Sequence, residues 1–178
     1  MKKALLIVLT TMFVASYAYA GPRDDIGLYF DTNHSVYTYF DTGDFSVDYY
    51  VHAYPAEPGL LAVEFKIVFP PIVYDYGSLT LNPDIYVTLG DISTGWSAAF
   101  AHCQPGGVWV QVYRQRIFCD TGIEPAGIIR ITETDDSQNL GLATCEMMNR
   151  PFTVISWALI NISNATKETS WGAIKNLF

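Results

Sequence analysis

The 178-residue sequence is poor in positive charge: 10 Lys and Arg residues stand against 18 Asp and Glu residues, and the net charge is −8. Nucleic acids and anionic membranes attract basic surfaces, so this shortage makes both of them poor partners. Histidine and cysteine are also scarce, with three residues of each. The histidines, His34, His52 and His102, show no paired spacing, which argues against a zinc site.

Beyond its first 20 residues, the sequence lacks an apolar run of the roughly 20 residues that a membrane-spanning helix needs. Those first residues have a different composition. Two lysines precede the apolar run Ala4–Val14, and the small residues Ala18 and Ala20 follow it. This order is typical of a secretory signal peptide, which we predict over residues 1–20. A membrane anchor is the alternative, but the apolar run is short for one. We therefore predict export to the periplasm, the cell surface or the extracellular space, with no transmembrane segment after cleavage.

The sequence also lacks common catalytic motifs: it has no G-x-S-x-G, no H-E-x-x-H and no phosphate-binding loop. Asp48 and Glu64, on neighbouring predicted strands, could form a carboxylate pair of the glycosidase kind. The alternation of these strands, however, places both carboxylates on the solvent face. His102 and Cys103 are poor as an imidazole–thiol pair, because adjacent residues of a strand point to opposite faces. We predict no catalytic residue and a protein that is not an enzyme.

No cofactor motif is present, and a structural calcium ion is the one metal that the sequence leaves open. Asp31, Asn33 and Ser35 offer oxygen ligands at the first alternate positions of a calcium loop. Val36 and Thr42 then stand where such a loop needs a glycine and a glutamate. A solvated turn is the simpler interpretation, so we predict no cofactor and no metal site.

What the sequence has in abundance is aromatic residues, including 12 Tyr and 10 Phe. With sparse charge, this composition is typical of pleated, half-buried strands. Val63, Phe65 and Ile67 alternate with Glu64 and Lys66, the period of two of a strand with one wet face. We predict a strand there and further strands at Ile26–Phe30, Ser35–Phe40, Phe45–Ala53, Ile85–Leu89, Trp96–His102, Val108–Phe118, Gly127–Thr132 and Phe152–Ile162.

The spacing of these strands indicates an all-β fold. Many short strands separated by Gly and Pro turns favour a two-layer antiparallel β-sandwich, and a closed barrel is the alternative. The mature chain of about 158 residues is long enough for one domain with a core. We predict the sandwich domain over residues 21–162 and a polar linker over residues 163–169.

The aromatic residues are too many for one core. An exposed ring on a sheet can stack on a sugar or anchor a protein interface. Trp109 and Tyr113 lie opposite the valines of their predicted strand, and Trp96 begins the strand before it. We predict Trp96, Trp109 and Tyr113 as a ligand surface, with ordinary scaffold packing as the alternative.

Three cysteines, Cys103, Cys119 and Cys145, follow the predicted leader. In an exported chain we expect one disulfide and one remaining thiol, and three pairings are open. If Trp96–His102 and Val108–Phe118 form a hairpin, Cys103 lies at its turn and Cys119 at its far end. A disulfide needs α-carbons within about 7 Å, so this geometry favours a bond that involves Cys145.

The last residues, 170–178, differ from the body. Thr169 or Ser170 can cap a helix, and Trp171, Ile174 and Phe178 then share one face of a short amphipathic helix. A helix of this length is not stable alone in water. We therefore predict that these three side chains dock on the sandwich, on a membrane surface or on a separate receptor.

The segment Thr169–Phe178 resembles the C-terminal Ser/Thr-Trp-Gly-x-Ile/Val-Lys-x-Leu-Tyr/Phe segment of a group of exported single-domain β-sandwich proteins of environmental bacteria. The body is similar to these proteins at Gly27–Asp31, Tyr49–His52, Phe65–Pro70 and Gly90–Cys103. The group has no established activity that the resemblance could imply here. At the level of the fold, the chain also resembles cohesin-type, immunoglobulin-like or jelly-roll sandwiches and carbohydrate-binding sandwiches.

Three function classes follow from these patterns. We favour an exported, non-enzymatic module that binds a protein or glycan at the cell surface or in a secreted assembly. A hydrolase of extracellular polysaccharide is the first alternative, and it needs a cleft with two facing carboxylates. A pilus-like subunit completed by a donated strand is the second, and it predicts an open apolar groove in an incomplete sandwich.

Overall fold

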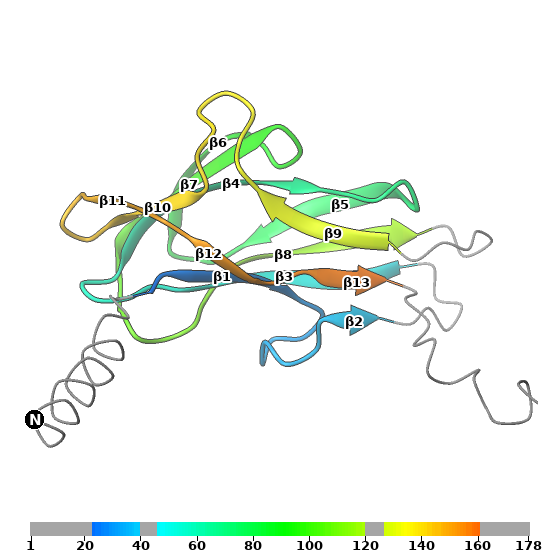
Figure 1. The fold of residues 1–178 in the computed structure, drawn as a ribbon, viewed down its shortest axis with the longest axis horizontal. Helices are drawn as coiled ribbons and strands as arrows, with labels where there is room; N and C mark the ends of the chain where they lie inside the picture. The colour runs from blue at the N-terminus through cyan, green and yellow to red at the C-terminus, as the bar shows by residue number, and fades with distance from the viewer. Residues whose placement is uncertain (1–22, 40–45, 120–126, 161–178) are drawn as a thin grey trace, which may run out of the picture.

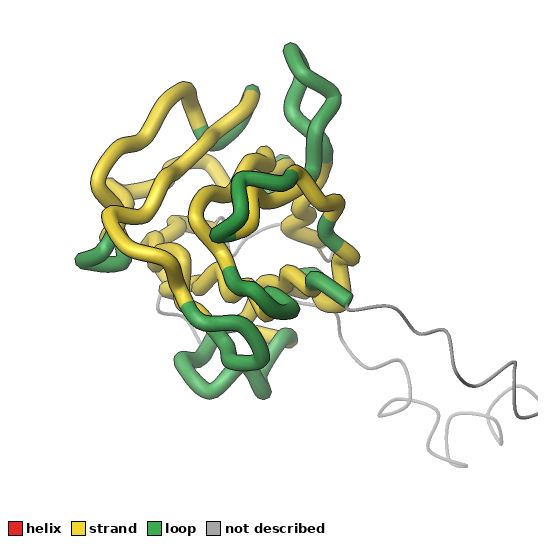
Figure 2. The backbone as a smooth tube through the Cα atoms, turned by 90° about the vertical axis from the view of Figure 1, so that its left-hand side faces the viewer, coloured by secondary structure: helices red, strands yellow, loops and turns green. Residues whose placement is uncertain are grey.

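The computed structural model describes residues 23–39, 46–119 and 127–160, and these form an all-β fold (Figure 1). Figure 2 shows strands joined by loops, with no helix in the described ranges. The strands are β1 (Asp25–Tyr29), β2 (Thr38–Tyr39), β3 (Ser46–Tyr54), β4 (Leu60–Val68), β5 (Val73–Leu81), β6 (Ile85–Asp91), β7 (Gly95–Gln104), β8 (Val110–Cys119), β9 (Gly127–Thr132), β10 (Gly141–Thr144), β11 (Asn149–Pro151), β12 (Thr153–Ser156) and β13 (Ala158–Ile160). The predicted leader and the predicted tail, with Trp171, Ile174 and Phe178, lie outside the described residues.

The strands form two sheets. One has the order β12-β1-β3-β8-β5, and the other has the order β11-β10-β4-β9-β13-β2, with β7 paired to β4 and β6 paired to β7. Most neighbours are antiparallel, whereas β1 with β12 and β13 with β2 are parallel. Over the described residues neither sheet closes on itself. The predicted β-sandwich is therefore confirmed, and the closed barrel is not formed.

The core lies between the sheets, and strand alternation fills it. In β4, Val63, Phe65 and Ile67 are buried, as their period of two predicts. Burying one such side chain contributes about 1.5–3 kcal/mol to stability. Glu64 and Lys66 point outward instead, where both bind the loop that follows β9.

A β-bulge in β8 changes which residues of that strand face the core. The pairing of β8 with β3 places Tyr113 opposite Val51 and Gln111 opposite His52, so Val112 is an extra residue. One extra residue reverses the alternation from that point on. Tyr113 consequently turns inward and is fully buried. The prediction that Tyr113 belongs to a ligand surface is wrong for this reason.

Trp96 is a core residue as well, and its prediction as a ligand-surface residue is wrong. Its side chain is 2% exposed. The register of β7 places Trp96 opposite Phe65 of β4, and both side chains point toward the five-stranded sheet. Ring centroids of Phe65 and Tyr113 each lie 5.4 Å from that of Trp96. Tight packing of large rings lets the core hold more aromatic residues than the sequence suggests.

One hydrogen-bonded network satisfies the polar groups of these core residues. The Tyr49 hydroxyl donates to Oε1 of Gln115 at 2.6 Å and lies 3.0 Å from the Tyr113 hydroxyl. Nε2 of Gln115 donates to the carbonyl of Gly77 at 2.8 Å. Burial raises the pKa of both tyrosine hydroxyls, so they stay protonated. Because each of these three polar side chains has a hydrogen-bond partner, their burial does not leave an unpaired polar group in the core.

The strand predictions differ from the structure in two ways. β5, β10 and β11 were not predicted, and only Thr38–Tyr39 of the predicted strand at Ser35–Phe40 is a described strand. The predicted strand Phe152–Ile162 divides at Trp157 into β12, which pairs with β1, and β13, which pairs with β9 and β2. The chain therefore crosses from one sheet to the other at Trp157.

A disulfide joins Cys103, near the end of β7, to Cys145, just after β10, with α-carbons 5.6 Å apart. The predicted involvement of Cys145 is confirmed, although the assumed hairpin is wrong. β7 pairs with β4 and β6, and β8 pairs with β3 and β5, so the loop 105–109 connects the two sheets. In the chain-entropy model, a link across 42 residues stabilises the fold by about 4 kcal/mol. Cys119 is a buried thiol.

Candidate functional site

An aromatic cluster covers the outer face of the five-stranded sheet, on the side away from the core. It contains Tyr29 of β1, His52 of β3, Trp109 just before β8 and His34 of the loop after β1. Strand alternation explains this placement, because the preceding residues of β1 and β3 point into the core. We call these four residues the outer cluster.

Gly27 makes room for the ring of Tyr29. A Cβ atom at Gly27 would lie 2.8 Å from atoms of that ring, so the tyrosine side chain folds back across the glycine. His52 is the cross-strand partner of Gly27. The Tyr29 ring therefore reaches His52, with ring centroids 5.8 Å apart in an edge-to-face arrangement. The contact depends on the missing side chain at residue 27.

The loop after β1 is folded over this cluster. Oδ1 of Asp31 accepts hydrogen bonds from the backbone N–H groups of Ser35 at 2.9 Å and Val36 at 2.8 Å. His34 lies between Asp31 and these two residues in the chain, and its φ of 49° is a left-handed conformation. Its ring stacks on Trp109, with centroids 4.6 Å apart and 24° between the planes. The Asp31 carboxylate, considered above as a calcium ligand, thus shapes the loop that carries His34.

His52 is a buried titratable group of the outer cluster. It is 3% exposed, and neither ring nitrogen has a hydrogen-bond partner among the described residues. Burial, assisted by the nearby His34, lowers the pKa of His52 to about 4, against an opposing effect of Asp31. The imidazole is therefore neutral at pH 7. It is held in place by ring contacts with Tyr29, His34 and Trp109.

A groove lies beside the outer cluster, where the chain crosses between the sheets. Its volume is about 410 Å³. One wall is the loop with His34, Ser35 and Tyr37, and the other includes Ile155, Ser156 and Trp157. The side chains of Tyr37 and Trp157 are 52% and 48% exposed. None of the lining side chains is acidic, and none is a lysine or an arginine.

Hydrogen bonds hold the walls of this groove in place. The backbone N–H of Leu159 donates to the carbonyl of Tyr37 at 2.8 Å and so joins the two walls. The Ser156 hydroxyl donates to a backbone carbonyl of β1 at 2.9 Å. The guanidinium carbon of Arg130 lies 5.8 Å from the centroid of the Trp157 ring, in a cation–π contact. The groove is consequently a preformed feature of the sandwich.

A second exposed apolar region is β6, which forms an edge of the eight-stranded sheet (Figure 1). β6 pairs with β7, and no other described strand pairs with it. Tyr86, Val87 and Leu89 are 82%, 43% and 68% exposed. Asp84 precedes the strand and Asp91 ends it, and both are exposed. An apolar edge strand of this kind can accept a further strand from another chain.

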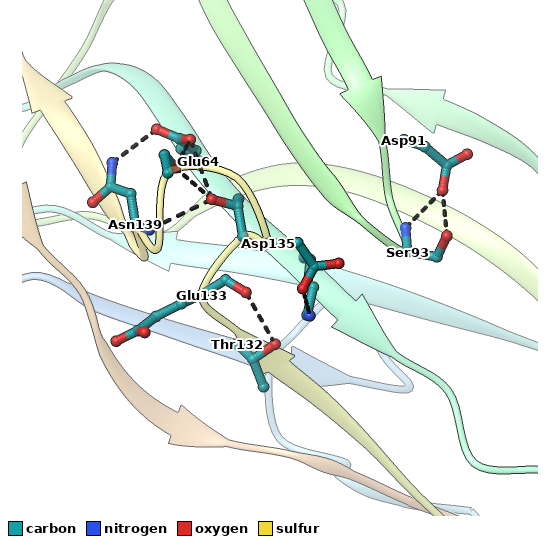
Figure 3. A network of polar contacts seen from close by, with 10 residues as sticks. Glu64, Asp91, Ser93, Thr132, Glu133, Asp135 and Asn139 are labelled. Atoms are coloured by element: carbon teal, nitrogen blue, oxygen red, sulfur yellow. Dashed lines mark hydrogen bonds and ion pairs between the residues drawn. The ribbon is translucent and has the colours of Figure 1, made fainter.

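Asp48 and Glu64 do not form a catalytic pair. Asp48 lies in β3, where it binds its cross-strand neighbour Arg116 through two hydrogen bonds of 2.8 and 3.1 Å. Glu64 lies in the other sheet, where it accepts hydrogen bonds from Ser137 and from Nδ2 of Asn139 at 2.8 Å (Figure 3). Both carboxylates hold structural partners on different sheets. They cannot flank one glycosidic bond.

The described part of the chain contains neither a metal-binding cluster nor a membrane-spanning helix. No three His, Cys, Asp or Glu side chains there are placed to hold one metal ion. No helix there is long and apolar enough to cross a membrane. The sequence-based expectations on metals and transmembrane segments stay predictions.

Of the three residues predicted as a ligand surface, Trp109 alone lies near the groove, and it is half-buried under His34. Tyr37 and Trp157 were not predicted, because no local pattern marks a groove between segments about 120 residues apart. A partial signal was present for Tyr29 and His52. Both belong to segments on which the resemblance to exported bacterial proteins rests.

The architecture can be compared with solved structures. The sixth cohesin of scaffoldin B from Acetivibrio cellulolyticus, solved with a Cel5 dockerin, matches with a TM-score of 0.57 at 8% identity, over 79% of this chain and 99% of the cohesin. The fold is that of the cohesin domains. No protein-family model matches the chain, and no curated protein matches it in sequence.

Two further cohesins support this assignment. A non-cellulosomal cohesin from the archaeon Archaeoglobus fulgidus matches with a TM-score of 0.52 at 10% identity, over 82% of this chain and 95% of that one. A type I cohesin–dockerin complex from Clostridium thermocellum gives 0.54 at 7% identity, over 79% and 95%. At these identities the likeness shows a shared cohesin-type fold and nothing finer.

Proposed function

We propose that this protein is an exported, non-enzymatic module that binds a protein partner along β6. Two of the cohesins described above were solved in complex with dockerins, and this supports a protein-binding role for the cohesin-type sandwich here. The observation that carries the proposal is the exposure of Tyr86, Val87 and Leu89 on one edge strand.

Strand addition is the mode of binding that β6 fits. The outer edge of β6 offers backbone N–H and C=O groups to a partner strand, and alternate side chains offer apolar contacts. Burying one side chain such as Leu89 would contribute about 1.5–3 kcal/mol. Asp84 and Asp91 flank the strand, and the whole chain carries a net charge of −8. Charge complementarity therefore favours a partner segment with basic residues at its ends.

The export part of the proposal rests on two observations. The first residues have the composition of a signal peptide, with the apolar run Ala4–Val14 ahead of Ala18 and Ala20. The structure then contains the Cys103–Cys145 disulfide, a bond that persists in oxidising compartments. The place of action would be the cell surface or a secreted assembly.

The alternative functions find less support. A polysaccharide hydrolase needs two facing carboxylates, and Asp48 and Glu64 lie on different sheets. A subunit completed by a donated strand needs an unfilled core. Inward side chains such as Leu28, Val51 and Ile129 are fully buried by the chain itself.

Site-specific photo-crosslinking in the producing cells tests the proposal. A benzophenone amino acid replaces Val87 of β6 in one variant and Val68 of β4 in a matched control, since these side chains are 43% and 41% exposed. We expect one protein adduct at position 87 that is absent at position 68. With that partner purified, Leu89→Lys should weaken binding at least about tenfold without lowering the melting temperature. Identical adducts at both positions, or unchanged binding of Leu89→Lys, would contradict the proposal.

A further inference from the structure

We propose that the groove between the loop after β1 and the β12–β13 crossing binds a neutral oligosaccharide, held between the half-exposed rings of Tyr37 and Trp157. This groove and β6 lie at different edges of the sandwich. The inference therefore stands or falls separately from the protein partner proposed above.

The charge of the lining indicates a neutral ligand. No acidic side chain, lysine or arginine lines the groove, and the histidine in its wall, His34, is stacked on Trp109. The carboxylate of Asp31, in the loop that forms one wall, is engaged by the N–H groups and the hydroxyl of its own loop. The guanidinium of Arg130 is placed against the Trp157 ring. A charged ligand would lose its hydration in this groove and find no partner of opposite charge.

The polar groups of the groove indicate a ligand rich in hydroxyls. The Ser35 hydroxyl donates to Oδ2 of Asp31 at 2.6 Å, and the Ser156 hydroxyl donates to the carbonyl of Leu28 at 2.9 Å. Each serine has thus used its proton, and its lone pairs are left to accept a hydrogen bond from a ligand. Burial raises the pKa of the Tyr29 hydroxyl, against an opposing hydrogen bond with Ser156, so this hydroxyl stays protonated at pH 7. A ligand rich in hydroxyls can donate to the remaining lone pairs, whereas a wholly apolar ligand would leave this acceptor capacity unused.

The exposed rings complete the match to a sugar. The face of an aromatic ring carries partial negative charge and attracts the C–H groups of a pyranose, which carry partial positive charge. Tyr37 and Trp157 present half-exposed rings on opposite walls. The volume of about 410 Å³ lies within the range of roughly 300–1,000 Å³ found for small-ligand sites. Because the hydrogen bond between Leu159 and Tyr37 already joins the walls, little ordering is needed on binding.

Saturation-transfer NMR with defined sugars tests this inference on the mature protein. The probes are gluco-, manno-, galacto- and xylo-oligosaccharides of two to six units at millimolar concentration, and calorimetry then gives the affinity of any that bind. We expect at least one of them to bind. Trp157→Ala and Tyr37→Ala should each weaken it about tenfold or more, whereas Trp157→Phe keeps a ring and should stay within about threefold.

Tyr86→Ala is the control, because it removes an even more exposed ring, 82% exposed, from β6 and should leave sugar binding unchanged. Melting temperatures verify that each variant is folded. We expect folded variants because both substituted side chains of the groove are half-exposed. Two results would overturn the inference. One is the absence of saturation transfer to every sugar, and the other is a bound sugar whose affinity neither Trp157→Ala nor Tyr37→Ala changes.

Discussion

On the inner face of the five-stranded sheet, Tyr49, Tyr113 and Gln115 are buried and form a hydrogen-bonded network. On the outer face, Tyr29 and His52 are buried as well, but ring contacts hold them, and the described residues offer the His52 nitrogens no hydrogen bond. An unpartnered polar group in such a place costs about 1–3 kcal/mol. The inner face therefore stabilises the fold, whereas the outer face lowers its stability through the unpaired His52 nitrogens and supports the loop that forms the groove.

The largest effect should come from the inner face. Tyr113→Ala removes a fully buried ring and should lower the free energy of unfolding by about 3–5 kcal/mol, measured by urea denaturation. Tyr37→Ala removes an exposed ring of the groove and should change it by less than about 0.5 kcal/mol. Equal values for the two variants would place Tyr113 outside the core.

Acid should act through the outer face. Unfolding raises the pKa of His52 from about 4 to its usual value near 6.5, so the unfolded chain binds a proton more readily. Stability contributed by neutral His52 is therefore present above pH 6.5 and lost as the pH falls, by about 3 kcal/mol at pH 4. We expect urea denaturation at pH 7 and pH 4 to show that the free energy of unfolding falls by about 3 kcal/mol less in His52→Phe than in the wild type.

The control for this acid effect is His102→Phe, which changes an exposed histidine of β7 and should keep the pH dependence of the wild type. Carboxylates also bind protons as the pH falls toward 4, so the effect of His52 is measured as the difference between the two variants. If His52→Phe and His102→Phe respond alike to acid, His52 is not the group responsible.

Gly27→Ala should have a smaller effect, of about 1–3 kcal/mol, because its Cβ would lie 2.8 Å from the Tyr29 ring and displace it from His52. Hydrogen exchange of the loop residues 31–37 should accelerate at the same time. Gly77→Ala in β5 is the matched control, since a Cβ there meets its nearest atom at 3.7 Å, an ordinary contact. Unchanged exchange in Gly27→Ala would mean that the outer cluster does not hold the loop.

Sequence patterns predicted the strands whose alternation is unbroken. Gly127–Thr132 was predicted with the bounds that β9 has, and the buried and exposed residues of β4 follow the predicted period. β5 was missed because two register shifts interrupt its pairing with β8. The bulge at Val112 likewise explains why the alternation of the sequence predicted the wrong face for Tyr113. A bulge depends on the partner strand, which the local sequence does not contain.

The candidate site was harder to predict than the fold. The groove joins Tyr37 of one loop to Trp157 of a strand crossing, and only the tertiary structure brings these residues together. Asp48 and Glu64 show the reverse error. They looked close because their strands follow each other in sequence, yet β3 and β4 belong to different sheets.

The disulfide between Cys103 and Cys145 has a consequence for a protein exposed to proteases. It closes a covalent ring that includes β8 of one sheet and β9 and β10 of the other. A single backbone cut inside that ring, for example in the loop 133–139, would leave both pieces in one molecule. Such a nicked chain would run at its full mass on a non-reducing gel and separate into two fragments after reduction.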